Sequence, residues 1–154
     1  MDVREAQNQQ EWDSFLVQQQ YRPFLQSWTM GEVYRTIGQQ PIRLEVRDGG
    51  EIAGICQAIV VPARRGRHLS VSYGPICSNE SLPPLLDSLK EHAREQNCSF
   101  IRLSPFWPKD RRISGSKPAP LHLLAEHLWY LNLKNNTEEE ILKNMRKNTR
   151  NLIR

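Results

Sequence analysis

The spacing of apolar residues near the start of the chain is typical of helices. Trp12, Phe15 and Leu16 follow an i, i+3, i+4 pattern, which places their side chains on one helix face. A second helical run begins at Trp28 and ends at Gly38, a residue type that commonly stops helices. The pattern therefore predicts two amphipathic helices in succession.

The pattern then changes to a period of two, which indicates β-strands. Residues 42–47 alternate apolar and charged side chains, so we expect a strand with one face in water. Residues 48–50 read Asp-Gly-Gly and predict a tight turn, while the apolar run at 52–61 predicts a central strand buried on both faces. Residues 69–73 return as another strand, so this segment predicts three antiparallel strands.

The next segment mixes one helix with irregular chain. Ser81 is expected to cap a helix that continues to Asn97, and residues 100–103 are expected to form a fourth strand. The stretch from 104 to about 127 contains four prolines, and a loop of this length is more often functional than idle. Residues 128–133 predict one further strand.

The last segment carries the clearest helix signals. Thr137 and Glu140 have the spacing of a capping box, which predicts that a helix begins there. Arg146, Arg150 and Arg154 follow at intervals of four residues and would form one ridge along that helix. No glycine, asparagine or proline stops the pattern at Arg154, so we expect the helix to run through the last residue. The apolar face of this helix would carry Ile141, Leu142, Met145 and Leu152.

The order of these elements predicts a fold class. Two helices, a three-stranded meander, a helix, a strand, a long loop, a strand and a helix follow the order of the acyl-CoA N-acyltransferase (GNAT) fold. We therefore predict an α/β (α+β) domain with a central, mostly antiparallel sheet flanked by helices. Residues 1–154 would form a single GNAT-like domain.

Charge is concentrated at one end of the chain. The net charge is +4, from 21 basic and 17 acidic residues, and five of the basic residues lie in the last twelve positions, which contain no acid. A polyanion such as RNA would relieve the repulsion along the arginine ridge. A second basic cluster at the predicted hairpin tip could contact phosphate or be a solvated turn. It consists of Arg64, Arg65, Arg67 and His68.

Standard catalytic and metal-binding signatures are absent from the sequence. It has no GxSxG, HExxH, GxxxxGK[ST] or GxGxxG motif, and His122 and His127 are too poorly spaced to suggest a metal pair. We therefore expect no metal. Three widely spaced cysteines, Cys56, Cys77 and Cys98, predict reduced thiols in a cytoplasmic protein.

The junction after the third strand argues against acetyl-CoA. A pyrophosphate site there needs a row of free backbone N–H groups. Residues 73–81 offer one glycine, Gly74, followed by Pro75, which lacks an N–H, and by the acidic Glu80. We therefore predict no acetyl-CoA dependence and no cofactor.

Several short segments, spread over nearly the whole chain, carry a resemblance to a known family. They are FLQSW at 24–28, GEV at 31–33, RRGR at 64–67, YGP at 73–75, WYLNL at 129–133, EEEIL at 138–142 and MRKNTRNLIR at 145–154. In this order and spacing they resemble the Fem family of aminoacyltransferases, the methicillin-resistance and peptidoglycan-bridge proteins. Met30 and Asn132 depart from the family pattern, which often has an aromatic residue and Asp at these places.

The resemblance implies a function. Family members have tandem GNAT-like domains and transfer an amino acid from aminoacyl-tRNA to the stem-peptide amine of a peptidoglycan precursor, lipid II or UDP-MurNAc-pentapeptide. By this resemblance the chain would be the first half of a two-domain protein, cut within a helix and inactive as a transferase alone. It would be cytoplasmic, with peripheral contact with the inner membrane face. The alternative is a non-catalytic RNA-binding or scaffold domain on a GNAT frame.

The resemblance also implies site residues. An aminoacyl ester is already activated, so the reaction needs positioning more than a nucleophile, and no catalytic residue is assigned. Precursor binding is expected at Trp28, Arg35, Tyr73, Gly74 and Pro75. Binding of tRNA is expected at Arg146, Arg150 and Arg154.

Overall fold

The computed structural model describes most of the chain. The described residues are 1–64, 66–107, 111–121, 124–125, 131, 133 and 136–153. They divide into two compact units, Met1–Leu124 and Ala125–Arg154. Arg65, His122, His127, Trp129, Tyr130, Asn132 and Arg154, which the sequence singled out, lie outside the described residues.

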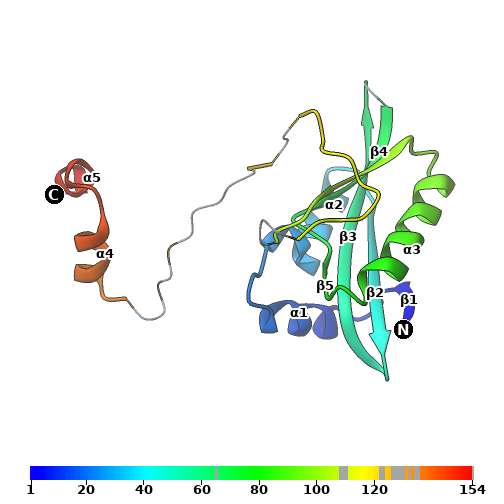
Figure 1. The fold of residues 1–154 in the computed structure, drawn as a ribbon, viewed down its shortest axis with the longest axis horizontal. Helices are drawn as coiled ribbons and strands as arrows, with labels where there is room; N and C mark the ends of the chain where they lie inside the picture. The colour runs from blue at the N-terminus through cyan, green and yellow to red at the C-terminus, as the bar shows by residue number, and fades with distance from the viewer. Residues whose placement is uncertain are drawn as a thin grey trace. The chain divides into compact units, whose positions relative to one another are not determined.

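A twisted sheet forms the centre of the first unit (Figure 1). Its strand order is β1-β2-β3-β4-β6, and the short β5 pairs with β3. Neighbouring strands are antiparallel except for β4 and β6, which are parallel, so the predicted mostly antiparallel sheet is confirmed. The strands are β1 (Asp2–Glu5), β2 (Pro41–Asp48), β3 (Glu51–Ala63), β4 (Gly66–Ser72), β5 (Ile76–Cys77) and β6 (Phe100–Ser104).

Helices cover both faces of this sheet. Figure 1 shows α1 and α2 on one face and α3 on the other. The three predicted helices of this unit are confirmed, with bounds α1 (Gln9–Gln18), α2 (Trp28–Thr36) and α3 (Leu82–Glu95). A short 3-10 helix that was not predicted, η1 (Phe24–Gln26), precedes α2. The larger core lies between the sheet and α3, where Leu85 and Leu89 pack on Leu44, Leu69 and Val71. Trp12, Leu16 and Ile55 form a smaller core on the α1 side.

One face of β2 differs from the prediction. The alternating charges at 42–47 indicated a face in water, yet Arg43 is only 5% exposed and Glu45 only 1% exposed. Each buried charge has a partner: Arg43 Nη2 donates to Glu32 at 2.8 Å, and Arg4 and Arg47 each donate to Glu45 Oε1 at 2.8 Å. Pairing lets both charges be buried, so the solvated-face interpretation is wrong.

The start of α3 also differs in detail. Ser81 immediately precedes the helix, but its side chain caps no backbone N–H. Its hydroxyl instead donates to Ala53 O at 3.3 Å, and its own backbone N–H donates to Ser78 Oγ at 3.2 Å. The predicted side-chain cap is therefore wrong, because Ser81 hydrogen-bonds to the β3 backbone.

The second unit contains two short helices, α4 (Glu138–Asn144) and α5 (Lys147–Ile153). The capping box of Thr137 and Glu140 is confirmed. The prediction of a single continuous helix is wrong, because Met145 adopts an extended conformation and ends α4. Neither helix buries a residue, so no tertiary packing joins them into one. The strand predicted at 128–133 lies outside the described residues except for Leu131 and Leu133.

Candidate functional site

A cavity of about 310 Å³ lies beside the amino-terminal end of β2. It is lined by the chain that follows β1, by α2 and by the first residues of β2. Trp28 and Arg35, two of the predicted precursor-binding residues, both line it. The remaining lining residues are Glu5, Ala6, Gln7, Pro41, Ile42 and Arg43.

Arg43 holds the wall of this cavity in place. Its Nε donates to Gln57 Oε1 at 3.0 Å, and its Nη2 donates to Trp28 O at 2.9 Å. The guanidinium carbon lies 3.9 Å from the centroid of the Trp28 ring, a cation–π contact. Gly31 makes this approach possible, since a Cβ there would lie 2.1 Å from Arg43 Nη2. The family-like Trp28 and Gly31 therefore fit around one buried arginine.

Glu32 carries the countercharge for both arginines of the cavity. It accepts from Arg43 Nη2 at 2.8 Å and from Arg35 Nη1 at 2.8 and 2.9 Å. These bonds, led by that of Arg43, hold the pKa of the Glu32 carboxyl below its ordinary value. Burial lowers the pKa of the Arg43 guanidinium, and Glu32 opposes that shift. Within the described structure, Nε and Nη2 of Arg35 have no partner and can meet a ligand.

The other predicted precursor-binding residues lie in the turn after β4. Tyr73 adopts a positive φ of 54°, and Gly74 and Pro75 are buried. A Cβ on Gly74 would lie 2.6 Å from Gln26 Cδ, so only glycine fits at this position. Of these three residues, Tyr73 alone has a side chain that reaches partly into solvent.

The chain that follows β6 packs against this turn. The Phe106 ring lies 5.7 Å from that of Tyr73 and 5.2 Å from that of Tyr21. Trp107 Nε1 donates to Pro75 O at 3.1 Å, and Arg111 Nη2 donates to Cys77 O at 3.0 Å. The proline-rich stretch is therefore attached to the Tyr73 turn through aromatic and arginine side chains.

The predicted precursor residues thus occupy two places. Trp28 and Arg35 share the cavity, and Tyr73 belongs to the aromatic cluster with Phe106. Sequence reasoning missed Arg43, which looked like a solvent-facing charge, and Arg111, which had no motif around it. The sequence feature that pointed to the aromatic cluster around Tyr73 was the Phe106-Trp107 pair within a long loop.

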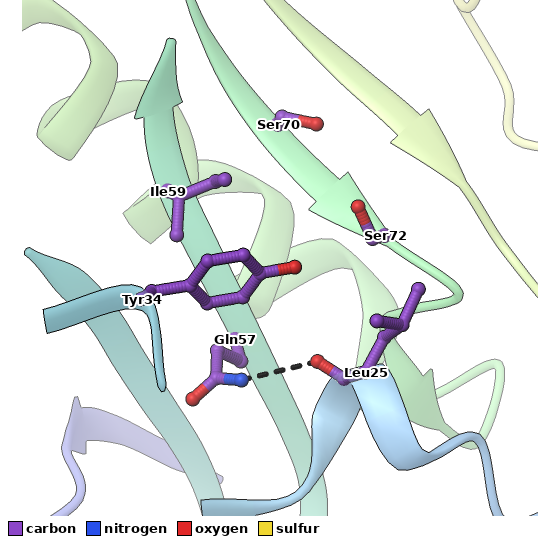
Figure 2. Close-up of a pocket in the computed structure, with 6 residues that line it drawn as sticks. All are labelled: Leu25, Tyr34, Gln57, Ile59, Ser70 and Ser72. Atoms are coloured by element: carbon purple, nitrogen blue, oxygen red, sulfur yellow. Dashed lines mark hydrogen bonds between the residues drawn. The ribbon is translucent and has the colours of Figure 1, made fainter. Parts of the chain in front are cut away.

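A third feature is a small hollow beside the sheet (Figure 2). Leu25, Tyr34 and Gln57 enclose a small hollow over β3 and β4, and Gln57 Nε2 donates to Leu25 O at 3.0 Å. The hollow leaves no room for a water molecule. Burial raises the pKa of Tyr34, and a hydrogen bond with Ser72 partly opposes that shift. This hollow is a packed contact between α2 and the sheet.

The junction before α3 is poorly suited to pyrophosphate. Pro83 and Pro84 occupy the first turn of α3 and supply no N–H. Hydrogen bonding from Ser78 lowers the pKa of Glu80, so this exposed carboxylate adds a negative charge beside the helix start. These features are consistent with the prediction that acetyl-CoA does not bind.

The predicted tRNA-binding residues lie in the second unit. Arg146 is exposed between α4 and α5, and Arg150 lies one turn later, with its N–H donating to Arg146 O at 3.1 Å. Arg154 lies outside the described residues. The basic hairpin tip is only partly described: Arg64 is exposed, and Arg67 Nε donates to Gln96 O at 2.7 Å.

The remaining features of the part of the chain that the structure describes are its thiols, its potential metal ligands and the lengths of its helices. There, Cys56, Cys77 and Cys98 are free thiols, and no group of three potential metal ligands occurs. No helix among these residues is long and apolar enough to cross a membrane.

Solved structures resemble this chain. The crystal structure of FemX is similar, with 28% identity and a TM-score of 0.63, over 72% of this chain and 29% of that one. A mutant of TTHA1254 from Thermus thermophilus is 18% identical with a TM-score of 0.59, covering 85% of this chain and 100% of that one. A ribosomal-protein-alanine N-acetyltransferase from Brucella melitensis biovar Abortus 2308 is 15% identical with a TM-score of 0.50, covering 79% and 100%.

The last two similarities concern the fold alone, and they confirm the predicted GNAT-like fold. The chain spans less than a third of the FemX chain that it matches. No curated protein sequence matches it. A sequence model of the FemAB family matches residues 8–122, a range that includes Trp28 and Arg35 of the cavity and the Tyr73 turn. The chain therefore belongs to the FemAB family.

Proposed function

We propose that this chain is the precursor-binding part of an aminoacyltransferase that acts in peptidoglycan synthesis. The donor would be aminoacyl-tRNA, and the acceptor would be the stem-peptide amine of lipid II or UDP-MurNAc-pentapeptide. Membership of the FemAB family and the similarity to FemX support this assignment. The observation that carries it is the cavity lined by Trp28 and Arg35, two residues that lie inside the matched range.

The chemistry of the cavity suits an anionic, partly apolar substrate. Arg35 has two nitrogen positions without partners among the described residues, and the Trp28 ring lies in the same wall. A volume of about 310 Å³ is too small for a complete nucleotide-linked peptide, so the cavity would hold one portion of it. A phosphate or carboxylate of the precursor would accept hydrogen bonds from Arg35 there.

The transfer itself places few demands on this chain. The precursor amine attacks the ester carbonyl of the aminoacyl-tRNA, and an amide bond forms as the ester C–O bond breaks. The released tRNA hydroxyl takes up a proton lost by the amine. Because the ester is already activated, correct placement of the two substrates supplies much of the rate. This agrees with a chain in which no nucleophile was identified.

The donor would contact the second unit through Arg146, Arg150 and Arg154. Arg146 is exposed and Arg150 is partly exposed, so both are available to phosphates. We place the reaction in the cytoplasm, where aminoacyl-tRNA is present, with peripheral contact with the inner membrane face when the precursor is lipid-linked.

Calorimetric titration of the 154-residue chain with UDP-MurNAc-pentapeptide tests the precursor site. We expect saturable binding that Arg35→Gln weakens about tenfold, the loss expected for a charge-assisted hydrogen bond. Arg22→Gln is the matched control, since Arg22 is exposed, carries the same charge and does not line the cavity. Absence of binding, or equal weakening by both variants, would contradict the proposal.

A transfer assay provides a separate measurement. Residues 1–154 alone, supplied with charged tRNA and the same precursor, are expected to give no product, because the chain spans only 29% of FemX. Product formation by this chain would show that it holds the complete catalytic apparatus and would contradict the expectation of inactivity.

A further inference from the structure

The β4–β6 part of the sheet has one apolar and one polar face. Leu69 and Val71 belong to the core under α3, and Leu103 packs against the same core. Successive side chains of a strand point to opposite faces, so the residues between them face the α2 side. That face carries His68, Ser70 and Ser72 on β4, and Phe100, Arg102 and Ser104 on β6.

Arg102 has no partner among the described residues of this face. Its side chain is partly buried, and its Nε is fully buried without a hydrogen-bond acceptor among the described residues. A buried N–H without an acceptor is unusual, which indicates that an acceptor from elsewhere completes the site at Arg102 Nε.

His68, two positions before Ser70 on β4, also has a buried nitrogen without a partner among the described residues. It is 4% exposed, its ring stacks on Phe100 at 4.7 Å, and its Nδ1 lies 3.2 Å from Gly66 O. The other ring nitrogen, Nε2, is buried and has no partner in the described structure. Because Ser70 pairs with Arg102, His68 is the diagonal neighbour of Arg102. Strand spacing and rise put their Cα atoms about 8 Å apart, within reach of both long side chains.

No acid of the surrounding strands can neutralise Arg102. Residues 52–79 and 96–109 contain neither Asp nor Glu, and they include all of β4 and β6 and nearly all of β3. The hydroxyl of Ser70, opposite Arg102, lines the hollow of Figure 2, which has no room for a water molecule, so it is not available to a ligand. Among the described residues, the face therefore presents a positive charge beside an unpaired ring nitrogen.

We propose that this face is a carboxylate-binding subsite, separate from the Trp28 cavity. Arg102 would donate from its guanidinium edge, with His68 closing the site. A carboxylate fits better than a phosphate, because a single guanidinium matches one negative charge and the planar fork of a carboxylate. The inference does not depend on amino acid transfer, since it rests only on the unpaired groups of β4 and β6.

The Nε–H signals of arginine in a ¹H–¹⁵N NMR spectrum test the subsite directly. The 154-residue chain would be titrated with N-acetyl-alanine at constant ionic strength, and Arg102→Gln would assign the Arg102 signal. We expect that signal to shift saturably, while that of the exposed Arg64 does not. The neutral methyl ester of N-acetyl-alanine is expected to cause no saturable shift, since it lacks the carboxylate.

Three results would overturn the proposal. One is an Arg102 signal that does not saturate, as when buried water alone satisfies Nε. Another is an equal response to acid and ester, and the third is tighter binding of inorganic phosphate than of the carboxylate. Arg64→Gln is the matched charge control for Arg102→Gln. If Arg102→Gln does not fold, the titration of the unaltered chain, with signals assigned by triple-resonance spectra, still decides the question.

Discussion

The carboxamide of Gln26 links two strands beneath Gly74. Its Nε2 donates to Ser72 O at 2.8 Å and to Gln57 O at 3.0 Å, while its Oε1 accepts from Gln57 N at 2.7 Å. A Cβ on Gly74 would lie 2.6 Å from this amide. The turn that carries Tyr73 is thereby held against η1 and β3 by a fully buried side chain.

Substitution of Gly74 tests this relationship. Gly74→Ala is expected to lower the free energy of unfolding by about 1–3 kcal/mol, because the added methyl group forces the buried amide to move. In a Gln26→Ala background the same substitution should cost less, since the obstructing amide is gone. Urea denaturation of the double-mutant cycle measures the coupling. Equal costs in both backgrounds would mean that Gln26 does not restrict Gly74.

Arg43 is expected to matter more for stability than Arg35, although both contact Glu32. Arg43→Met should lower the free energy of unfolding by about 2 kcal/mol or more, because Gln57 and the Trp28 carbonyl lose a buried charged donor. Arg35→Met should have only a small effect, since its side chain is 45% exposed. Thermal or urea unfolding of both variants checks the order, and a reversed order would contradict the network described for the cavity.

Cys77 should make stability depend on alkaline pH. Burial raises the pKa of its thiol from 9.0 to about 11 in the folded chain. Between these values the unfolded chain has lost the proton and the folded chain has kept it, so stability falls as pH rises. Urea unfolding at pH 8 and pH 10 should therefore show that the free energy of unfolding falls less between these pH values for Cys77→Ala than for the unaltered chain. An identical loss in both would exclude a contribution from this thiol.

Acetyl-CoA should not bind. Pro83 and Pro84 remove backbone donors at the start of α3, and Glu80 places a negative charge where a pyrophosphate would lie. Calorimetric titration at micromolar concentrations is expected to give no saturable heat. A saturable signal that is lost when phosphate competes would reverse this conclusion.

The arginines of the second unit should set tRNA affinity. Replacing Arg146 and Arg150 by glutamine is expected to weaken binding about tenfold and to reduce the salt slope by about one for each lost phosphate contact. Lys90→Gln with Arg94→Gln, on exposed positions of α3, removes the same charge and serves as the control. Unchanged affinity and slope would leave both the donor site and the RNA-binding alternative without support.

Several structural features follow from residues that are neighbours along the chain. The capping box of Thr137 and Glu140, the tight turn at residues 48–50 and the periodic helices need no distant partner, and the structure confirms each of them. The short β1 and β5 were missed, because a polar four-residue strand and a two-residue strand carry too little periodicity to be distinguished from loop.

Other features depend on distant residues. Alternation along β2 is the same whether its charged face meets water or α2, and only the position of Glu32 decides that Arg43 is buried. Similarly, Ser81 has the residue type of a cap, but its contact with Ala53 O depends on how β3 lies beside the helix start. The pattern after Thr137 also allows a continuous helix, which no packing enforces.

The sequence by itself therefore determined the main helices and strands of the first unit, the GNAT-like fold class and the motifs of the family, because local spacing and composition carry them. Only the tertiary structure decided that Trp28 and Arg35 share a cavity while Tyr73 packs with Phe106, and that Arg102 has no partner among the described residues of its sheet face. Each of these facts depends on which side chains meet across strands and helices far apart in the chain, and no periodicity encodes such a meeting.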